Sequence, residues 1–215
     1  MQPIETELKL ISYNTPPNQH EIILIRIDPS FVYFKYLYLF SNDIQEHINS
    51  YINYRDKLVA FTSAMLKYYY LPTILGINPA ETQIEIDSYG KPHLLNYPAI
   101  DFSVSHSGEY VVLAVAFGGN IGIDIEFIDK HIDLTIKSIV FSDFECKLIN
   151  NYYDFFVLWS KKESYLKCLG FGFSNEIHRH TTLNNQLLES FNQYKLNTLI
   201  LGGNYVLSVC VTNIL

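Results

Sequence analysis

Two acidic residues lie two positions apart in the segment Gly122-Ile-Asp124-Ile-Glu126. On a β-strand, residues i and i+2 face the same side, so the carboxylates of Asp124 and Glu126 project together while Ile123 and Ile125 enter the core. Like charges that close repel, and one group stays protonated unless a cation lies between them. Mg²⁺ favours oxygen ligands and commonly takes carboxylates together with phosphate oxygens and water. The pattern is compatible with a metal site, although taken alone it is more typical of a strand with one solvated face.

A third acidic residue, Glu163, lies on a predicted helix over residues 152–169. Trp159, Glu163 and Lys167 recur every four residues and therefore share one helical face. An exposed Glu–Lys pair of this spacing is an ordinary surface feature that stabilises a helix by roughly 0.3 kcal/mol. Trp159 is the only tryptophan of the chain, which indicates that this face is partly buried. A charged pair beneath a buried ring needs a partner, and a metal–phosphate cluster would supply one.

The segment Phe102-Ser-Val-Ser105-His106-Ser-Gly108 is rich in groups that donate hydrogen bonds. We interpret it as a turn before a strand, in which backbone N–H, hydroxyl and imidazole groups could bind phosphate. A turn of this composition is as easily only a turn. His106 is not expected to belong to a catalytic triad, because no G-x-S-x-G pattern occurs in the chain.

Two further basic residues are candidate anion contacts. Lys91 lies in the turn Gly90-Lys91-Pro92, and Arg55 lies on a predicted helix in the first part of the chain. A lysine in a turn is a point charge that phosphate can use. A solvated surface position is the alternative interpretation for each residue.

The sequence segments that position these residues form a weak internal repeat. Residues 21–28, 40–46 and 110–115 resemble residues 121–128, 141–145 and 205–210, in the same order and at an offset of about 100 residues. This predicts an internal duplication, in which each half is a small, mostly antiparallel sheet packed on a long helix. The fold class is α+β, with one half over residues 1–117 and the other over 118–215. A cleft between such halves is a natural place for a ligand.

The individual elements follow from local patterns. Apolar β-branched runs predict strands at 21–28, 84–86, 109–117, 121–127, 199–201 and 205–211. Helices are expected from Ser41 or Asn42 to Tyr70, ending near Pro72, and over 152–169, closed by Gly170 and Gly172. Glycine pairs at 118–119 and 202–203 predict two hairpins.

Composition limits the class of protein. Apolar residues make up 48% of the 215 residues and charged residues 17%, which is typical of a globular protein. A net charge of −7 without a basic stripe argues against nucleic-acid binding. No apolar run reaches a membrane span and no secretion signal opens the chain, so we expect no membrane association and a cytoplasmic protein. Cys146, Cys168 and Cys210 are widely spaced and are expected to be reduced thiols, not zinc ligands.

Taken in order, these segments resemble the 4′-phosphopantetheinyl transferases, specifically the larger monomeric type that activates peptide and polyketide synthetases. The resemblance covers roughly residues 87–173. It is carried by Gly90-Lys-Pro92, Phe102–Gly108, Ile121–Glu126, Phe141-Ser142 with Glu145, and Trp159–Ser164 with Lys167, Gly170 and Gly172. It implies two similar α+β halves around a cleft for coenzyme A, the first contributing phosphate contacts and the second the metal ligands and the catalytic helix.

By position, the resemblance implies roles for individual residues. Asp124, Glu126 and Glu163 fall at the metal ligands, for Mg²⁺ or Mn²⁺, and Glu163 and Lys167 at catalytic positions. The expected coenzyme A contacts are Arg55, Lys91, Ser105, His106 and Lys162. The region before residue 50 departs most from the family, since the basic residues often found there for the 3′-phosphate are sparse.

The implied reaction transfers the phosphopantetheine part of coenzyme A to a serine of an apo acyl or peptidyl carrier protein and releases 3′,5′-ADP. The serine proton would pass to Glu163 or to a metal-bound water, and the sequence does not choose between them. Aromatic residues near Phe127 or Phe141 are candidates for carrier docking, and core burial is the alternative for each. A coenzyme A-binding module without activity and a metal-dependent phosphoesterase are the alternative functions.

Overall fold

The computed structural model of the protein describes residues 9–14, 20–171, 190–191 and 194–212. Helices and antiparallel sheets occur together, which confirms the predicted α+β class. In this described part of the chain, no helix has both the length and the apolar character that crossing a bilayer requires. The three cysteines are free thiols, as expected.

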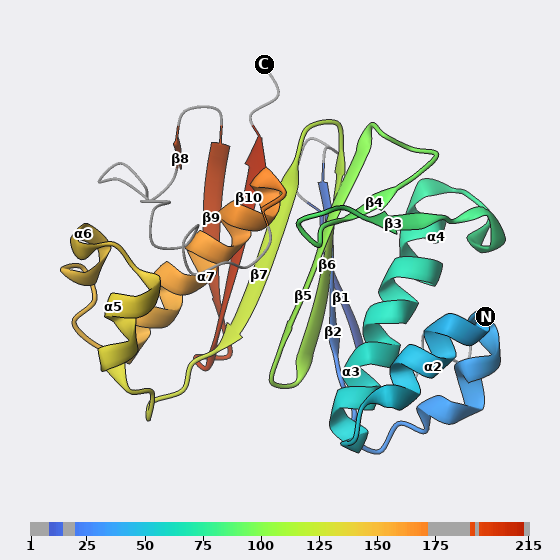
Figure 1. The fold of residues 1–215 in the computed structure, drawn as a ribbon, viewed down its shortest axis with the longest axis horizontal. Coiled ribbons are helices and arrows are strands. Elements are labelled where there is room, and N and C mark those ends of the chain that lie inside the picture. The colour runs from blue at the N-terminus through green and yellow to red at the C-terminus, as the bar shows by residue number, and fades with distance from the viewer. Residues whose placement is uncertain (1–8, 15–19, 172–189, 192–193, 213–215) are drawn as a thin grey trace.

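Most strands belong to two four-stranded sheets (Figure 1). The first has the order β1-β2-β6-β5 and comprises β1 (Lys9–Asn14), β2 (His20–Arg26), β5 (Ile100–Ser107) and β6 (Tyr110–Phe117). The second has the order β7-β10-β9-β8 and comprises β7 (Ile121–Phe127), β8 (Ser190–Phe191), β9 (Tyr194–Leu201) and β10 (Tyr205–Thr212). A two-stranded sheet joins β3 (Ile84–Ile86) to β4 (Pro92–Leu94).

Three consecutive strands are arranged alike in the two large sheets. In the series β2-β6-β5 and β7-β10-β9, the strand that comes first in the sequence pairs with the strand that comes last. The strand that lies between them in the sequence pairs with the opposite edge of that last strand. An internal duplication would produce this likeness, and the duplication itself stays a prediction. The strands of the two sheets come from either side of residues 118–120.

The sheets pack face to face, and helices cover their outer faces. Side chains such as Ile22 and Leu24 of β2 contact a buried cluster that includes Ile123 and Ile125 of β7. The outer face of the first sheet carries α3 (Tyr54–Met65), and that of the second carries α7 (Tyr152–Leu169) (Figure 1). Strands covered on both faces are apolar at successive positions, which explains the uninterrupted apolar run in β6.

The helical part of the first half differs from the prediction. In place of one helix from residue 42 to 70, α2 (Asn42–Ser50) is separated from α3 by an extended backbone at Tyr51. Pro72 does not end the helix, since α3 continues through a π-helical segment (Leu66–Tyr70) into α4 (Leu71–Leu75). Proline is tolerated there because it lies in the first turn of α4. Gly76, in the left-handed conformation at φ 67°, ends the helix.

The second half contains α5 (Lys137–Val140), α6 (Asp143–Cys146) and α7. The predicted bounds of α7 are confirmed. Its first turn is capped by the Asn151 side chain, which accepts a hydrogen bond from the backbone N–H of Asp154, and Gly170 ends it at φ 80°. Gly172 lies outside the described residues.

One of the two predicted hairpins is wrong. Strands β9 and β10 pair around Gly202 and Gly203 as expected, but β6 and β7 do not pair. Both edges of β6 are already occupied by β2 and β5. The chain therefore uses Gly118 and Gly119, at φ 97° and 72°, to leave the first sheet and begin the second.

Along one side of the two packed sheets, the edge strands β5 and β7 lie next to each other. They are joined by hydrogen bonds between side chains and backbone instead of by backbone pairing. Four alternate residues of β5 accept hydrogen bonds from four alternate backbone N–H groups of β7, and we call this set the β5–β7 ladder. Its bonds run from Ile121 N to Asp101 Oδ2 (2.7 Å), Ile123 N to Ser103 Oγ (3.1 Å), Ile125 N to Ser105 Oγ (3.3 Å) and Phe127 N to Ser107 Oγ (2.9 Å). Edge N–H groups that would otherwise be buried without partners are satisfied in this way.

The segment Phe102–Gly108 is therefore not the turn that its composition suggested. Residues 100–107 form β5, and only Gly108 and Glu109 turn the chain into β6. Because the serines alternate along a strand, they all face β7.

Glycine is required at position 122, where α7 packs directly on β7. A Cβ added there would lie 2.0 Å from the backbone oxygen of Ser164 and 2.4 Å from the backbone nitrogen of Cys168. Both neighbours are backbone atoms of a helix, so neither can move away alone.

We expect Gly122→Ala to lower the free energy of unfolding by about 3 kcal/mol, because α7 must move away from β7. Urea unfolding measures this loss. The matched control is Gly76→Ala, where an added Cβ meets no atom within 4 Å and only the left-handed backbone is strained, at about 1–2 kcal/mol. A Gly122→Ala protein as stable as the control would contradict the close approach of α7.

Candidate functional site

The centre of the site is the outer face of β7, beneath α7. Asp124 and Glu126 project from this face as their spacing predicted, and Asp124 is only 3% exposed. Lys167 Nζ lies 2.7 Å from Asp124 Oδ1 and 3.1 Å from Ser105 Oγ, and the Ser105 hydroxyl donates to Asp124 Oδ1 at 3.0 Å. The structure thus brings together predicted residues from β5, β7 and α7.

Glu126 is held by two donors from different elements. The indole N–H of Trp159 donates to Oε1 at 3.0 Å, and the Ser107 hydroxyl donates to Oε2 at 3.1 Å. The sequence pointed to Trp159 as part of a buried face, but not to its partner. Ser107 was missed as a site residue, although its position two residues after Ser105 on a strand could have indicated it.

Both carboxyl groups are harder to ionise than an ordinary acid. Burial raises the pKa of Asp124, the Lys167 ammonium opposes this rise, and the negative charge of Glu163 adds to it. Burial, with a further contribution from the charge of Asp124, raises the pKa of Glu126 to about 7. Glu163 lies on α7, one turn before Lys167.

The donor set fits a hard divalent cation. Asp124 Oδ2 is buried and accepts no hydrogen bond from any described residue, and the other donors are carboxylate oxygens, which Mg²⁺ prefers. Across the ranges that the structure describes, no three His, Cys, Asp or Glu side chains are already gathered as a complete metal site. Lys167 instead supplies the positive charge beside Asp124. The assignment of Asp124, Glu126 and Glu163 as metal ligands stays a prediction.

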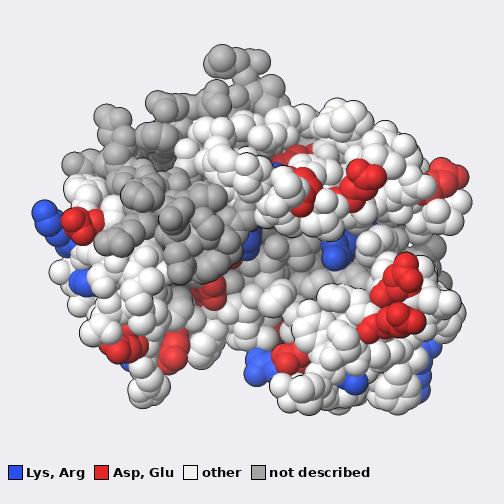
Figure 2. Space-filling view, in the orientation of Figure 1, with Lys and Arg blue, Asp and Glu red and all other residues white. Residues whose placement is uncertain are grey.

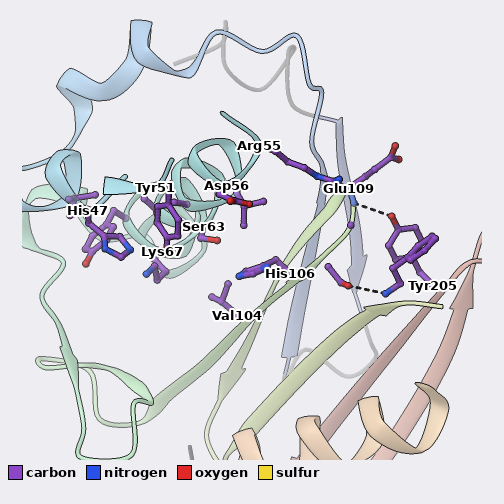
Figure 3. Close-up of a pocket in the computed structure, with 18 of the residues that line it drawn as sticks. His47, Tyr51, Arg55, Asp56, Ser63, Lys67, Val104, His106, Glu109 and Tyr205 are labelled. Carbon is purple, nitrogen blue, oxygen red and sulfur yellow. Dashed lines mark hydrogen bonds between the residues drawn. The ribbon is translucent and has the colours of Figure 1, made fainter. Parts of the chain in front are cut away.

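A cavity of about 1300 Å³ is lined by residues from both halves (Figure 3). Arg55 and Lys67 of the first-half helices line it, together with His106, which Figure 3 shows projecting between strands and helix. Burial lowers the pKa of His106, the Lys167 ammonium lowers it further, and Asp56 opposes both. Ser107 also lines this cavity and donates to Glu126, so it connects the cavity with the carboxylate site.

Lys67 is a cavity residue that the sequence did not single out. Its ammonium is half-buried, and burial lowers its pKa. Among the described residues it has no carboxylate partner within ion-pair distance, and its nearest ring contact is Tyr68 at 5.9 Å. It lies four residues after Ser63, which also lines the cavity, so both residues belong to one helical face.

Lys91 lies apart from Arg55 and His106. Its ammonium pairs with Asp101 at 2.6 Å and is 9% exposed, and it lines a smaller cavity of about 400 Å³ beside the end of α7. Asp101 is also the first rung of the β5–β7 ladder, so in this structure Lys91 supports the junction of the sheets. A coenzyme A contact for Lys91 stays a prediction.

Lys162 requires a correction. Its side chain has no exposed surface, and its ammonium pairs with Glu145 at 2.8 Å beneath the ring of Phe141. Glu145 also closes the capping box of α6 with Ser142. The helical position resembles a phosphate contact, but α6 covers the side chain. Lys162 is a buried structural cation and not a ligand contact in this structure.

Comparison with known proteins decides the family. A family model described as 4′-phosphopantetheinyl transferase, N-terminal, matches residues 28–117. A second, described as the 4′-phosphopantetheinyl transferase superfamily, matches residues 120–210. Together the two matches cover most of the chain. The chain belongs to the 4′-phosphopantetheinyl transferase superfamily.

Individual phosphopantetheinyl transferases align with parts of this chain. A 4′-phosphopantetheinyl transferase of Bacillus subtilis is 38% identical over 46% of this chain and 46% of its own length. The transferase gsp of Aneurinibacillus migulanus is 34% identical over 61% of this chain and 56% of its own. Sfp of Bacillus subtilis is 31% identical over 64% of this chain and 66% of its own. The alignments therefore span about half to two thirds of these relatives.

The raised pKa of Glu126 predicts how the stability of this protein depends on pH. Between the ordinary value of 4.5 and about 7, the folded protein keeps a proton that the unfolded chain has released. The free energy of unfolding therefore falls as pH rises through this window, by up to about 3 kcal/mol, and levels off above it. We expect Glu126→Gln to remove most of this fall.

Urea unfolding at pH 5 to 8 in the presence of EDTA measures the effect. Glu85→Gln, a change at an exposed glutamate outside the site, is the control and should keep the wild-type profile. A Glu126→Gln protein with an unchanged profile would contradict the burial of this carboxyl group.

Proposed function

We propose that this chain transfers the 4′-phosphopantetheine part of coenzyme A to a serine of an apo carrier protein and releases 3′,5′-ADP. The observation that supports this most directly is the joint placement of Asp124, Lys167 and Ser105, with Lys167 Nζ 2.7 Å from Asp124 Oδ1. The buried carboxylate thus has a lysine ammonium beside it, and Ser107 of the same strand as Ser105 lines the large cavity. The membership of the superfamily agrees with this activity.

The cavity provides room and positive charge for a coenzyme. Its volume of about 1300 Å³ exceeds that of common cofactor sites, which are roughly 300–1,000 Å³. Arg55, Lys67 and His106 line it and are suited to phosphate groups, although the chain carries a net charge of −7. Among the described residues on the face shown in Figure 2, Lys and Arg form no continuous patch, so attraction of an anionic ligand depends on these local groups.

Asp124, Glu126 and Glu163 would hold a Mg²⁺ ion, which when bound supplies positive charge to the diphosphate oxygens. Lys167 would release Asp124 to this cation and stabilise the negative charge that develops on the departing nucleotide. The bond from the serine oxygen to the β-phosphorus forms as the bond from that phosphorus to the bridging oxygen breaks. The serine hydroxyl loses its proton in this step, and Glu163 is the candidate base among the side chains.

The carrier is expected to dock beside the cavity. Phe127 lines the cavity and is 44% exposed, so it is available for an apolar contact. Phe141 is 1% exposed and packs against Phe155 and Trp159, which removes it as a docking residue.

The test is mass spectrometry of an apo acyl or peptidyl carrier protein after incubation with this protein, coenzyme A and Mg²⁺. We expect the carrier to gain one phosphopantetheine group.

Asp124→Asn and Glu163→Gln should lower kcat by about 10³-fold or more, because they remove charge that holds the cation. Lys167→Gln should lower kcat by about 10²-fold with a smaller effect on KM for coenzyme A.

The control is Glu85→Gln, which lies outside the site and should keep the wild-type rate. Binding of coenzyme A without transfer to any carrier would support an inactive binding module. Hydrolysis of coenzyme A in the absence of a carrier would support a phosphoesterase, and either result would overturn the proposal.

A further inference from the structure

The β5–β7 ladder contains the same unit twice. The Ser105 hydroxyl accepts the N–H of Ile125 at 3.3 Å and donates to the preceding carboxylate, Asp124, at 3.0 Å. The Ser107 hydroxyl accepts the N–H of Phe127 at 2.9 Å and donates to the preceding carboxylate, Glu126, at 3.1 Å. A hydroxyl has one proton and two lone pairs, so each serine can do both. Each serine thereby fixes a carboxylate relative to the strand that carries it.

Ser103 occupies the third equivalent position, without a carboxylate to hold. It accepts the N–H of Ile123 at 3.1 Å, and the residue before Ile123 is Gly122. Ser103 is therefore a natural control for Ser107. Ser103 supports only the junction of the sheets, whereas Ser107 supports the junction and also holds an acidic side chain.

Glu126 accepts hydrogen bonds at both of its carboxylate oxygens, whereas Asp124 accepts them at only one within the described part of the chain. Both of its oxygens accept hydrogen bonds, from Ser107 and from Trp159 Nε1, whereas Asp124 Oδ2 accepts none from the described residues. The indole is itself held by its neighbours. Its ring stacks on Phe155 with a centroid distance of 6.4 Å and meets Phe141 edge-on at 6.1 Å. The N–H of Trp159 therefore points in a direction set by packing.

We propose that Ser107 and Trp159 are positioning residues, which hold Glu126 in the orientation in which it binds the divalent cation of the proposed reaction. The inference rests on the proposed metal site. Groups that orient ligands in this way are a general feature of metal sites, and their loss commonly weakens metal affinity by about 10- to 100-fold. Both residues would act through Glu126, with which each forms a hydrogen bond.

The experiment measures Mn²⁺ binding by isothermal titration calorimetry without coenzyme A, and the midpoint of thermal unfolding, for wild type and four variants. Ser107→Ala and Trp159→Phe should each weaken Mn²⁺ binding by about 10-fold or more. Ser107→Thr keeps the hydroxyl and should bind within about threefold of wild type. Ser103→Ala removes a ladder bond of the same kind and should lower the unfolding midpoint while leaving Mn²⁺ binding unchanged.

Equal Mn²⁺ affinity in Ser107→Ala and Ser103→Ala would overturn the proposal, because Ser107 would then be only a rung of the ladder. A wild-type protein that binds no Mn²⁺ would overturn it as well. Carrier modification by the wild type is measured in parallel. Mn²⁺ binding that follows the expected order in a protein that modifies no carrier would support the positioning role and refute the proposed transfer.

Discussion

The β5–β7 ladder is the interaction on which the rest of the structure depends. Two sheets that share no backbone pairing are joined where Asp101, Ser103, Ser105 and Ser107 accept the edge N–H groups of β7. Four hydrogen bonds at a fixed spacing set the register of β7 against β5, and a slip of one residue would turn every side chain to the other face. The ladder thus joins the halves and decides which way Asp124 and Glu126 point.

The second constraint is the close approach of α7 to β7. With no side chain at Gly122, the backbone of α7 reaches the strand, so Trp159 contacts Glu126 and Lys167 contacts Asp124. Burying like charges is costly, and the raised pKa of both carboxyl groups reflects that cost. The Lys167 ammonium and the hydrogen-bond donors on β5 and α7 offset this cost of burial. The ion pair with Lys167 is the charge partner that the structure shows for Asp124.

Much of the fold and part of the site followed from sequence patterns. The bounds of α7 were predicted because Gly170 and a long periodic run define them locally, and the shared face of Asp124 and Glu126 followed from strand periodicity. The errors concern contacts between distant segments. The Gly118-Gly119 pair resembles a hairpin, but pairing of β6 on both edges sends β7 elsewhere. Likewise, nothing near Lys162 in the sequence indicates that its ammonium would be buried against Glu145. The alternate serines of residues 103–107 are typical of a turn by composition, and only their contacts with β7 explain why they lie on a strand.

The most direct test of this account is anomalous diffraction from crystals of the protein grown with Mn²⁺ and coenzyme A. The account predicts one anomalous peak, at about 2.1 Å from carboxylate oxygens of Asp124, Glu126 and Glu163, with diphosphate oxygens on its open side. Lys167 should no longer contact Asp124 Oδ1. A peak elsewhere, or a Glu163 side chain turned away from β7 in the complex, would contradict it.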